Sequence, residues 1–292
     1  MEHVAAAVVL ALAAAATSPY VGEIEHWRAQ REERLKADNG WLTVSGLFWL
    51  KDGATTFGSA AGNDIVLPAS APARAGVIQF SGGKASVRVE PGVRILSGDE
   101  PVTAMDLRAD TAPGGPDVLV LGALSLQVIE RGGRYGIRLK DNDSPQRKAF
   151  AGTQWYPVSA AYRVTARFVP NAKPKTIAIA NVLGQEEQQA SPGYAVFTIN
   201  GQEARLDPNL DEPDAKELFF IFKDPTSGRD TYPAGRYLYT DLPKDGTVTL
   251  DFNKAVSPPC AFTAYATCPL PPPQNRLAVR IEAGEKKPAP LH

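Results

Sequence analysis

Apolar and polar residues alternate with a period of two along most of the chain after Gly40. Short runs rich in β-branched and aromatic residues are separated by Gly, Pro and Asp, a pattern typical of antiparallel sheets. The predicted strands are WLTVSGLFWL, DIVLP, VIQF, ASVRVE, DVLVLG, LSLQVIE and RYGIRL, followed by AYRVTARFV, TIAIANV, YAVFTI, ELFFIFKD, TVTLDFN and LAVRIEA. Almost nothing after Gly40 has the period of a long helix. The pattern predicts a mostly β protein in two linked parts.

One amphipathic helix is predicted before these strands. Ser18 can serve as its N-cap, Pro19 suits its first position, and Asn39-Gly40 offers a stop. Its apolar side combines Ile24, Trp27 and Leu35 with the stem of Arg31. We expect this side to pack on the domain that follows, with partner binding as the alternative.

The first residues contain an apolar run of 13 residues, Val4–Ala16, that ends in small side chains. A membrane span needs about 20 apolar residues, so this run predicts a signal peptide over residues 1–16, with no stable membrane span after its removal. The start, Met1-Glu2-His3, lacks the usual positive charge, and an alanine-rich helix is the alternative. Export predicts a periplasmic or secreted protein.

The predicted elements divide the chain into successive parts. The amphipathic helix occupies residues 17–40, a β-sandwich residues 41–150, and a second antiparallel β domain with a proline-rich loop residues 151–284. The remaining residues, 285–292, are predicted to form a disordered tail.

Charge and histidine content exclude several functions. The net charge is −1, and no basic stripe is present, so nucleic-acid binding is not expected. Only three histidines occur, and His26 alone is a realistic candidate for a catalytic or metal-binding role. A serine or cysteine nucleophile activated by histidine is therefore not expected, and neither is a zinc site with several histidine ligands. No phosphate-binding glycine loop is found. We therefore predict no cofactor and no metal.

Polar side chains follow two predicted strands of the second domain. Asp224 ends ELFFIFKD on its apolar face, and Asp251 and Asn253 share the other face of TVTLDFN. Tyr232 and Arg236 lie in the turn-rich link between these strands. The group could orient a planar anion, or it could tie turns and strand ends together.

The segment from Ser257 to Leu277 is rich in proline and contains both cysteines. Proline stiffens this loop, which could hold Asn275 in place and cover a pocket above Asp251 and Asn253. If the chain is exported, Cys260 and Cys268 are predicted to form a disulfide that contributes at most about 2.5 kcal/mol. An inert reduced pair and a reactive pair are the alternatives.

Several motifs together resemble the bacterial DUF1684 family of uncharacterised proteins. They are GWLTVSGLFWLKDG, YGIRLKDNDSPQRKAFAGTQWYPV, KDPTSGRDTYPAGRYL and DFNKAVSPPCAFTAYATCPLPPPQNRL, and the similarity extends over nearly all of the chain after the signal. The resemblance implies no assured activity. It implies that one group of positions belongs together, namely Asp224, Thr226, Tyr232, Arg236, Asp251, Asn253, Cys260, Cys268 and Asn275.

The stretch from Phe57 to Leu139 is similar, more weakly, to forkhead-associated (FHA) sandwiches. FGSAAGNDIVLP resembles their opening turn. Ser59 stands where these domains have a phosphate-binding arginine, and SAPARAG replaces their next binding loop. The resemblance therefore implies an FHA-like fold without the phosphopeptide function.

We expect the second β domain to bind a small polar molecule or a glycan. The predicted ligand-binding residues are Thr226, Tyr232, Arg236, Asn253 and Asn275. One alternative is a hydrolase without a catalytic histidine that uses Asp224 and Asp251 as an acid and base pair. Another is a protein interaction module that uses a surface of Trp41, Phe48 and Trp49. The sequence leaves open whether the protein is an enzyme.

Overall fold

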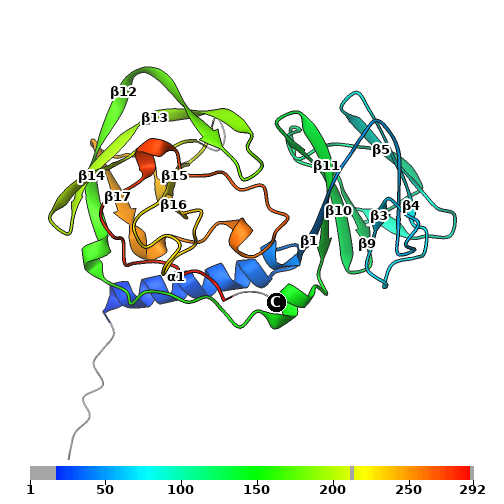
Figure 1. Cartoon of the computed structure of the whole chain (residues 1–292), viewed down its shortest axis with the longest axis horizontal. Helices are drawn as coiled ribbons and strands as arrows, with labels where there is room; N and C mark the ends of the chain where they lie inside the picture. The colour runs from blue at the N-terminus through cyan, green and yellow to red at the C-terminus, as the bar shows by residue number, and fades with distance from the viewer. Residues whose placement is uncertain (1–17, 211–213, 290–292) are drawn as a thin grey trace, which may run out of the picture.

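The computed structural model describes residues 18–210 and 214–289. Two β units lie side by side, and one long helix lies beneath one of them and ends at their junction (Figure 1). The mostly β fold with an N-terminal helix is confirmed. In the described part of the chain, no helix is both long and apolar enough to cross a membrane. The predicted signal peptide lies outside the described residues.

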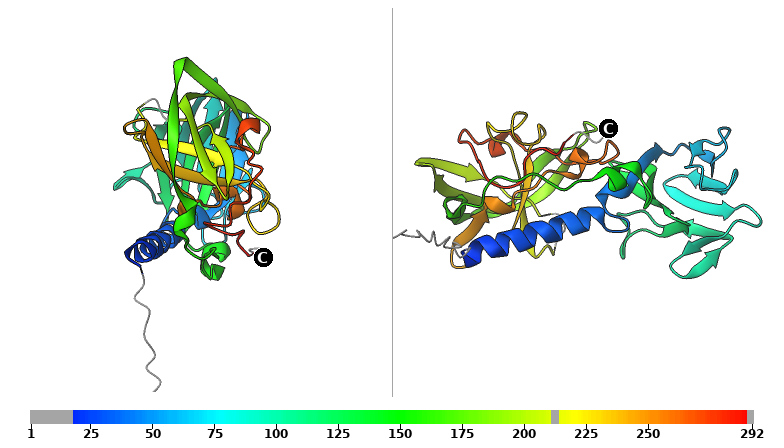
Figure 2. Two further views of the ribbon diagram at one scale, coloured as in Figure 1. Left: turned by 90° about the vertical axis from the view of Figure 1, so that its left-hand side faces the viewer. Right: turned by 90° about the horizontal axis from the view of Figure 1, so that it is seen from below.

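The helix α1 (Pro19–Lys36) follows the predicted pattern. Ser18 is its N-cap, and Ile24 and Leu35 on its apolar side are buried. The chain turns away after the helix at Asn39, which has a φ of 60°. A short helix η1 (Trp41–Thr43) then leads into the first unit. The C-terminal end of the helix lies at the junction between the two units (Figure 2).

The first unit consists of two sheets packed face to face. One sheet has the strand order β1-β11-β10-β9-β6-β7, and the other has the order β3-β2-β4-β5-β8. Their bounds are β1 Val44–Trp49, β2 Gly53–Gly58, β3 Ile65–Val66, β4 Gly76–Ser81, β5 Lys84–Val89, β6 Ile95–Ser97, β7 Glu100–Val102, β8 Ala104–Leu107, β9 Val118–Leu121, β10 Leu124–Arg131 and β11 Arg134–Asp141. One hydrophobic core lies between the sheets. This is the sandwich that the FHA resemblance predicts.

The second unit contains a sheet of order β14-β13-β12-β17 and a hairpin, β15-β16. Their bounds are β12 Arg163–Ala180, β13 Glu186–Ile199, β14 Gln202–Leu206, β15 Glu217–Phe222, β16 Arg236–Asp241 and β17 Thr247–Asp251. Short helices lie before and after them: α2 Pro145–Ala149, η2 Ala160–Tyr162, η3 Phe252–Lys254, η4 Pro259–Ala261 and η5 Pro273–Asn275. Strand β16 was missed from the sequence, which predicted a turn-rich link there.

Strand β15 is buried on both faces. Leu218, Phe220 and Phe222 pack into the main core of the second unit. Phe219 and Ile221 point the other way, into a smaller cluster against which Trp27 of α1 and Trp41 pack. The alternation predicted for ELFFIFKD is correct. Its second face, however, packs against Trp27 and Trp41 instead of facing solvent.

The predicted strand LAVRIEA does not pair with any strand in the described residues. Its alternation is real, since Leu277, Val279 and Ile281 are buried in the main core. Its backbone is bonded differently, because the carbonyls of Ile281 and Ala283 accept hydrogen bonds from the guanidinium of Arg236. The Arg236 side chain thus supplies hydrogen bonds that a neighbouring strand would otherwise supply. The alternation of apolar residues does not reveal this difference.

The predicted disordered tail is held to the second unit over its described residues. Glu285 is fully buried and bridges to Trp155. The amide of Lys286 donates to Gln154, and that of Lys287 donates to Asp230. The prediction was wrong at least as far as Lys287, because the polar composition of this segment does not reveal its backbone partners.

Replacing Arg236 with alanine is expected to destabilise the protein by about 3–5 kcal/mol, since the change leaves the buried Asp224 carboxylate without its cation. Denaturant unfolding measures this loss. Arg280 is the matched control, because its ion pairs with Asp230 and Glu282 are solvent-exposed. Arg280→Ala should leave the free energy of unfolding close to that of the wild type. Equal losses for the two variants would contradict the anchoring role.

Candidate functional site

Asp224, Thr226 and Arg236 form one buried network. The Arg236 Nη2 atom lies 3.1 Å from Asp224 Oδ1, and the side chains of both are inaccessible to solvent. The Thr226 hydroxyl donates to the same carboxylate at 2.9 Å, and the amide of Ile281 donates to it at 2.8 Å. The network ties a turn and the C-terminal segment to the hairpin, as the alternative interpretation of these residues predicted.

Asp251 and Asn253 belong to a second network at the start of α1. Asp251 accepts hydrogen bonds from the Asn253 amide at 3.1 Å and from the Tyr20 hydroxyl at 2.9 Å. The Asn253 side chain donates to the carbonyl of Ser159 at 2.8 Å and accepts from its amide at 3.0 Å. These bonds hold η3 and the first turn of α1 to the sheet.

Asn275 and Tyr232 each serve the backbone elsewhere. The Asn275 amide donates to the carbonyls of Asp207 and Ile221 at 2.8 and 2.9 Å, and its oxygen accepts from Asp207. The Tyr232 hydroxyl donates to the carbonyl of Cys260 at 2.9 Å. The predicted site residues therefore form separate networks, and the structure does not bring them around one cavity.

A cavity of about 410 Å³ lies at the junction of the two units. Helix α1, η1, the sandwich and the second unit all contribute to its walls. The proline-rich segment lines it through Ser257, Pro259, Thr267, Cys268 and Pro269. The segment thus walls a cavity, but this cavity is not above Asp251 and Asn253.

Arg138 lines the cavity from the sandwich side. Along β11, Ile137 and Leu139 point into the core of the sandwich, so Arg138 between them projects from the opposite face. It is only 6% exposed, yet its Nε and Nη2 atoms have no hydrogen-bond partner in the described residues. Its guanidinium carbon lies 5.4 Å from the centre of the Trp41 ring.

The electrostatic environment of Arg138 is unfavourable. Burial, followed by the positive charge of Arg131, lowers the pKa of Arg138 to about 10. Burial and the charge of Arg138 also lower the pKa of nearby Lys140. Arg138 therefore remains charged at neutral pH, in a low-dielectric position without a counterion bonded to it.

Two more arginines line the cavity, and both have partners. Arg131 pairs with Asp110 at 2.8 Å and donates to the Thr267 hydroxyl at 3.0 Å. Arg31 of α1 donates to the carbonyl of Ser257 at 3.1 Å, and its Nε lies 3.7 Å from Glu285. Of these three arginines, Arg138 alone makes no hydrogen bond to the described residues.

Aromatic rings of the hairpin form the facing wall. Phe219 and Tyr239 stack with ring centres 4.5 Å apart and planes at 6°. Tyr237 packs edge-on against Phe219 at 4.9 Å. Phe219 is buried, whereas Tyr239 is 43% exposed. All three residues line the cavity.

Both cysteines are free thiols in this structure. The amide of Cys260 donates to the Cys268 sulfur at 3.0 Å. The hydrogen bond between the two thiols lowers the pKa of Cys260 and raises that of Cys268. Cys268, which lines the cavity, is therefore a poor nucleophile at neutral pH. Among residues 18–210 and 214–289, no group of three metal-ligating side chains comes together.

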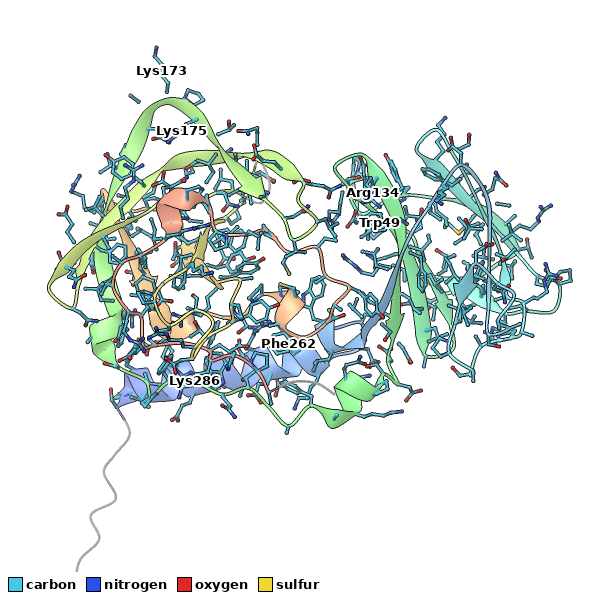
Figure 3. The ribbon with its side chains drawn as sticks, in the orientation of Figure 1. Trp49, Arg134, Lys173, Lys175, Phe262 and Lys286 are labelled. Atoms are coloured by element: carbon cyan, nitrogen blue, oxygen red, sulfur yellow. The ribbon has the colours of Figure 1, made fainter. Side chains whose placement is uncertain are left out.

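The predicted aromatic interaction surface is not exposed. Trp41 lies beneath Arg138, and Phe48 packs against the sandwich core. Trp49 is covered by the guanidinium of Arg134, 4.3 Å from its ring (Figure 3). Arginine side chains thus cover two of these rings, and both pairings join residues far apart in the chain, so sequence spacing does not reveal them.

Arg138 was missed from the sequence, although a signal was present. In RYGIRLKD, the charged Arg138 and Lys140 alternate with buried Ile137 and Leu139. Such alternation normally indicates a solvated face. Only the packing of the second unit against this sheet makes the face a cavity wall.

The fold and the cavity define a β protein of two units with a basic, aromatic-lined cavity at their junction. Residues 148–286 match DUF1684, a family described as a protein of unknown function. The resemblance is confirmed over this part of the chain, which is less than the nearly complete coverage expected. The match includes the aromatic wall but not Arg31, Arg131 or Arg138.

Solved structures similar to the chain include an uncharacterised protein of Haloarcula marismortui. It has 29% identity, covers 48% of this chain and 78% of its own, and gives a TM-score of 0.41. The FhaA FHA domain in complex with an intracellular domain has 17% identity, 32% and 97% coverage, and a TM-score of 0.23. An FHA domain of a Mycobacterium tuberculosis ABC transporter has 23% identity, 30% and 77% coverage, and a TM-score of 0.23. A search of curated proteins finds no match.

Glu285 should make stability depend on pH. Burial raises its pKa from 4.5 to about 7, an effect only partly offset by Arg31. The folded state then holds a proton that the unfolded state releases between pH 4.5 and 7. This contribution to stability is present below pH 4.5 and is lost as pH rises through 7, by about 3 kcal/mol.

Glu285→Gln tests this dependence through unfolding free energies measured from pH 4.5 to 8. The variant cannot ionise, so its stability relative to the wild type should increase as pH rises. Glu282→Gln is the control, since Glu282 is largely exposed and pairs with Arg280. A constant difference between wild type and Glu285→Gln across this range would contradict the raised pKa.

Proposed function

We propose that this protein binds a small anionic molecule in the junction cavity. The observation that carries the proposal is the charged guanidinium of Arg138, whose buried Nε and Nη2 atoms have no hydrogen-bond partner in the described residues. A carboxylate or phosphate group would supply the missing partners, because both match the planar donors of arginine.

The energetic cost of an unpaired buried charge supports this proposal. Such a group loses hydration without recovering it, at a cost of several kcal/mol. Arg236 in the same protein has a carboxylate and two carbonyls as partners, so its burial has a structural explanation. Arg138 has no comparable explanation within the described residues, and binding an anion supplies one.

The alternative functions have less support. A hydrolase built on Asp224 and Asp251 requires both carboxylates in one cleft, whereas each is engaged in its own network and neither lines the cavity. An interaction module requires an exposed apolar patch. The aromatic residues named for that role are partly buried.

We also propose export and a disulfide between Cys260 and Cys268. The apolar run Val4–Ala16 supports export, and the contact between the Cys260 amide and the Cys268 sulfur supports pairing in an oxidising compartment. Formation of the bond removes two protons and two electrons, which a disulfide-exchange partner accepts.

Arg138→Met tests the anion site, because methionine retains an apolar stem without the charge. We expect acetate or inorganic phosphate, at low ionic strength, to raise the melting temperature of the wild type and to leave that of the variant unchanged. Without added anion, the variant should be at least as stable as the wild type, since it removes an unpaired charge.

Arg134→Met is the matched control for this test. Arg134 lies on the same strand and the same face, but it covers Trp49 and does not line the cavity (Figure 3). Its stabilisation by acetate or phosphate should equal that of the wild type. Equal stabilisation of Arg138→Met, or a large loss of its stability without anion, would overturn the proposal.

The disulfide is tested by labelling thiols with a maleimide in denaturant, on protein exported into a bacterial periplasm. We expect no labelled thiol before reduction and two after it. Cys268→Ser should expose one thiol, that of Cys260, without reduction. Two labelled thiols in unreduced wild type would show that the pair stays reduced after export.

A further inference from the structure

We infer that the anion bound in this cavity carries an aromatic ring. The ligand would then be a carboxylate with an attached aromatic group, and not a glycan. This inference rests on the proposed function and adds the chemistry of the ligand's other end. It depends on three features of the cavity: its size, the hydrogen-bonding state of its polar groups and its aromatic wall.

The cavity is too large for a simple anion alone. Its volume of about 410 Å³ lies within the range of about 300–1,000 Å³ typical of pockets for small organic molecules. A carboxylate bound at Arg138 would fill one side of this space. A body attached to that group would fill the remainder.

The neutral polar groups of the cavity are already engaged. Asn181 bonds to Gln185, and Gln189 accepts from Asn209. The Thr267 hydroxyl accepts from Arg131, and the Tyr237 hydroxyl donates to the carbonyl of Pro269 at 2.9 Å. A glycan requires many such groups for its hydroxyls. Among the residues that line the cavity, the buried donor atoms without a partner in the described structure are guanidinium nitrogens of Arg31 and Arg138, which favour an anion.

The wall opposite Arg138 is apolar and aromatic. Phe219, Tyr237 and Tyr239 form a continuous set of ring contacts there, and Ile179 and Val256 extend the apolar surface. An aromatic ring can stack or pack edge-on against such rings, with a gain beyond its buried area. The anion and the ring of one ligand would then contact the sandwich and the second unit, respectively.

The inference is tested by titration calorimetry with four probes. They are acetate, 3-phenylpropionate, the neutral alcohol 3-phenylpropanol and a neutral oligosaccharide such as maltotriose. We expect 3-phenylpropionate to bind at least about tenfold more tightly than acetate, because it adds a buried ring. The alcohol should bind more weakly than 3-phenylpropionate, and the oligosaccharide should not bind.

Two variants separate the ends of the ligand. Arg138→Met should abolish binding of both carboxylates. Tyr239→Ala should weaken 3-phenylpropionate about tenfold and leave acetate unchanged. Tyr265→Ala is the control, since Tyr265 is similarly exposed, at 39%, but does not line the cavity. It should bind both carboxylates as the wild type does.

The outcomes distinguish this inference from the proposed function. If acetate binds through Arg138 and 3-phenylpropionate binds no more tightly, the aromatic inference fails and the anion site stands. If the alcohol binds as tightly as 3-phenylpropionate, the anion site fails. Tighter binding of the oligosaccharide than of either carboxylate would overturn the inference in favour of a glycan. Absence of binding by all four probes would overturn both.

Discussion

The ion pair between Arg236 and Asp224 organises the second β unit. Neither side chain contacts solvent, and the guanidinium also bonds to the carbonyls of Ile281 and Ala283. Through these contacts a strand of the hairpin holds a C-terminal segment that forms no ladder of its own. That segment completes the main core with Leu277 and Val279. A buried charge is stable here because a carboxylate and two backbone carbonyls supply partners to it.

Arg138 is also buried, but it lacks the hydrogen-bond partners that Arg236 has in the described residues. It projects from β11 toward the second unit, its pKa is lowered by burial and by Arg131, and it makes no hydrogen bond to the described residues. The difference between Arg236 and Arg138 lies in their partners and not in their depth. Arg236 bonds to groups of the fold itself, whereas Arg138 Nε and Nη2 find no partner in the described residues. That contrast supports a structural role for Arg236 and the proposed binding role for Arg138, whereas burial alone would not distinguish them.

The sequence predicted the local structure well because local structure follows periodicity. The helix from Pro19, the two-faced strand ELFFIFKD and the proximity of Asp251 to Asn253 were all predicted correctly. A pocket walled by the proline-rich segment was predicted, but its location was not. Its location depends on how two units dock, and the alternation around Arg138 looks the same whether its face meets water or another domain. The polar residues near strand ends were predicted to bind a ligand, but they bond to backbone groups and to one another there.

The cavity is assembled from segments far apart in the chain. Its arginines come from α1 and the sandwich, and its rings and proline-rich wall come from the second unit. The family match begins at residue 148, so it covers the rings and the loop without the arginines. A relative that shares only the matched part would share the apolar wall and would need its own source of positive charge. The proposed anion binding therefore depends on the docking of both units in this chain, and the family match alone does not imply it.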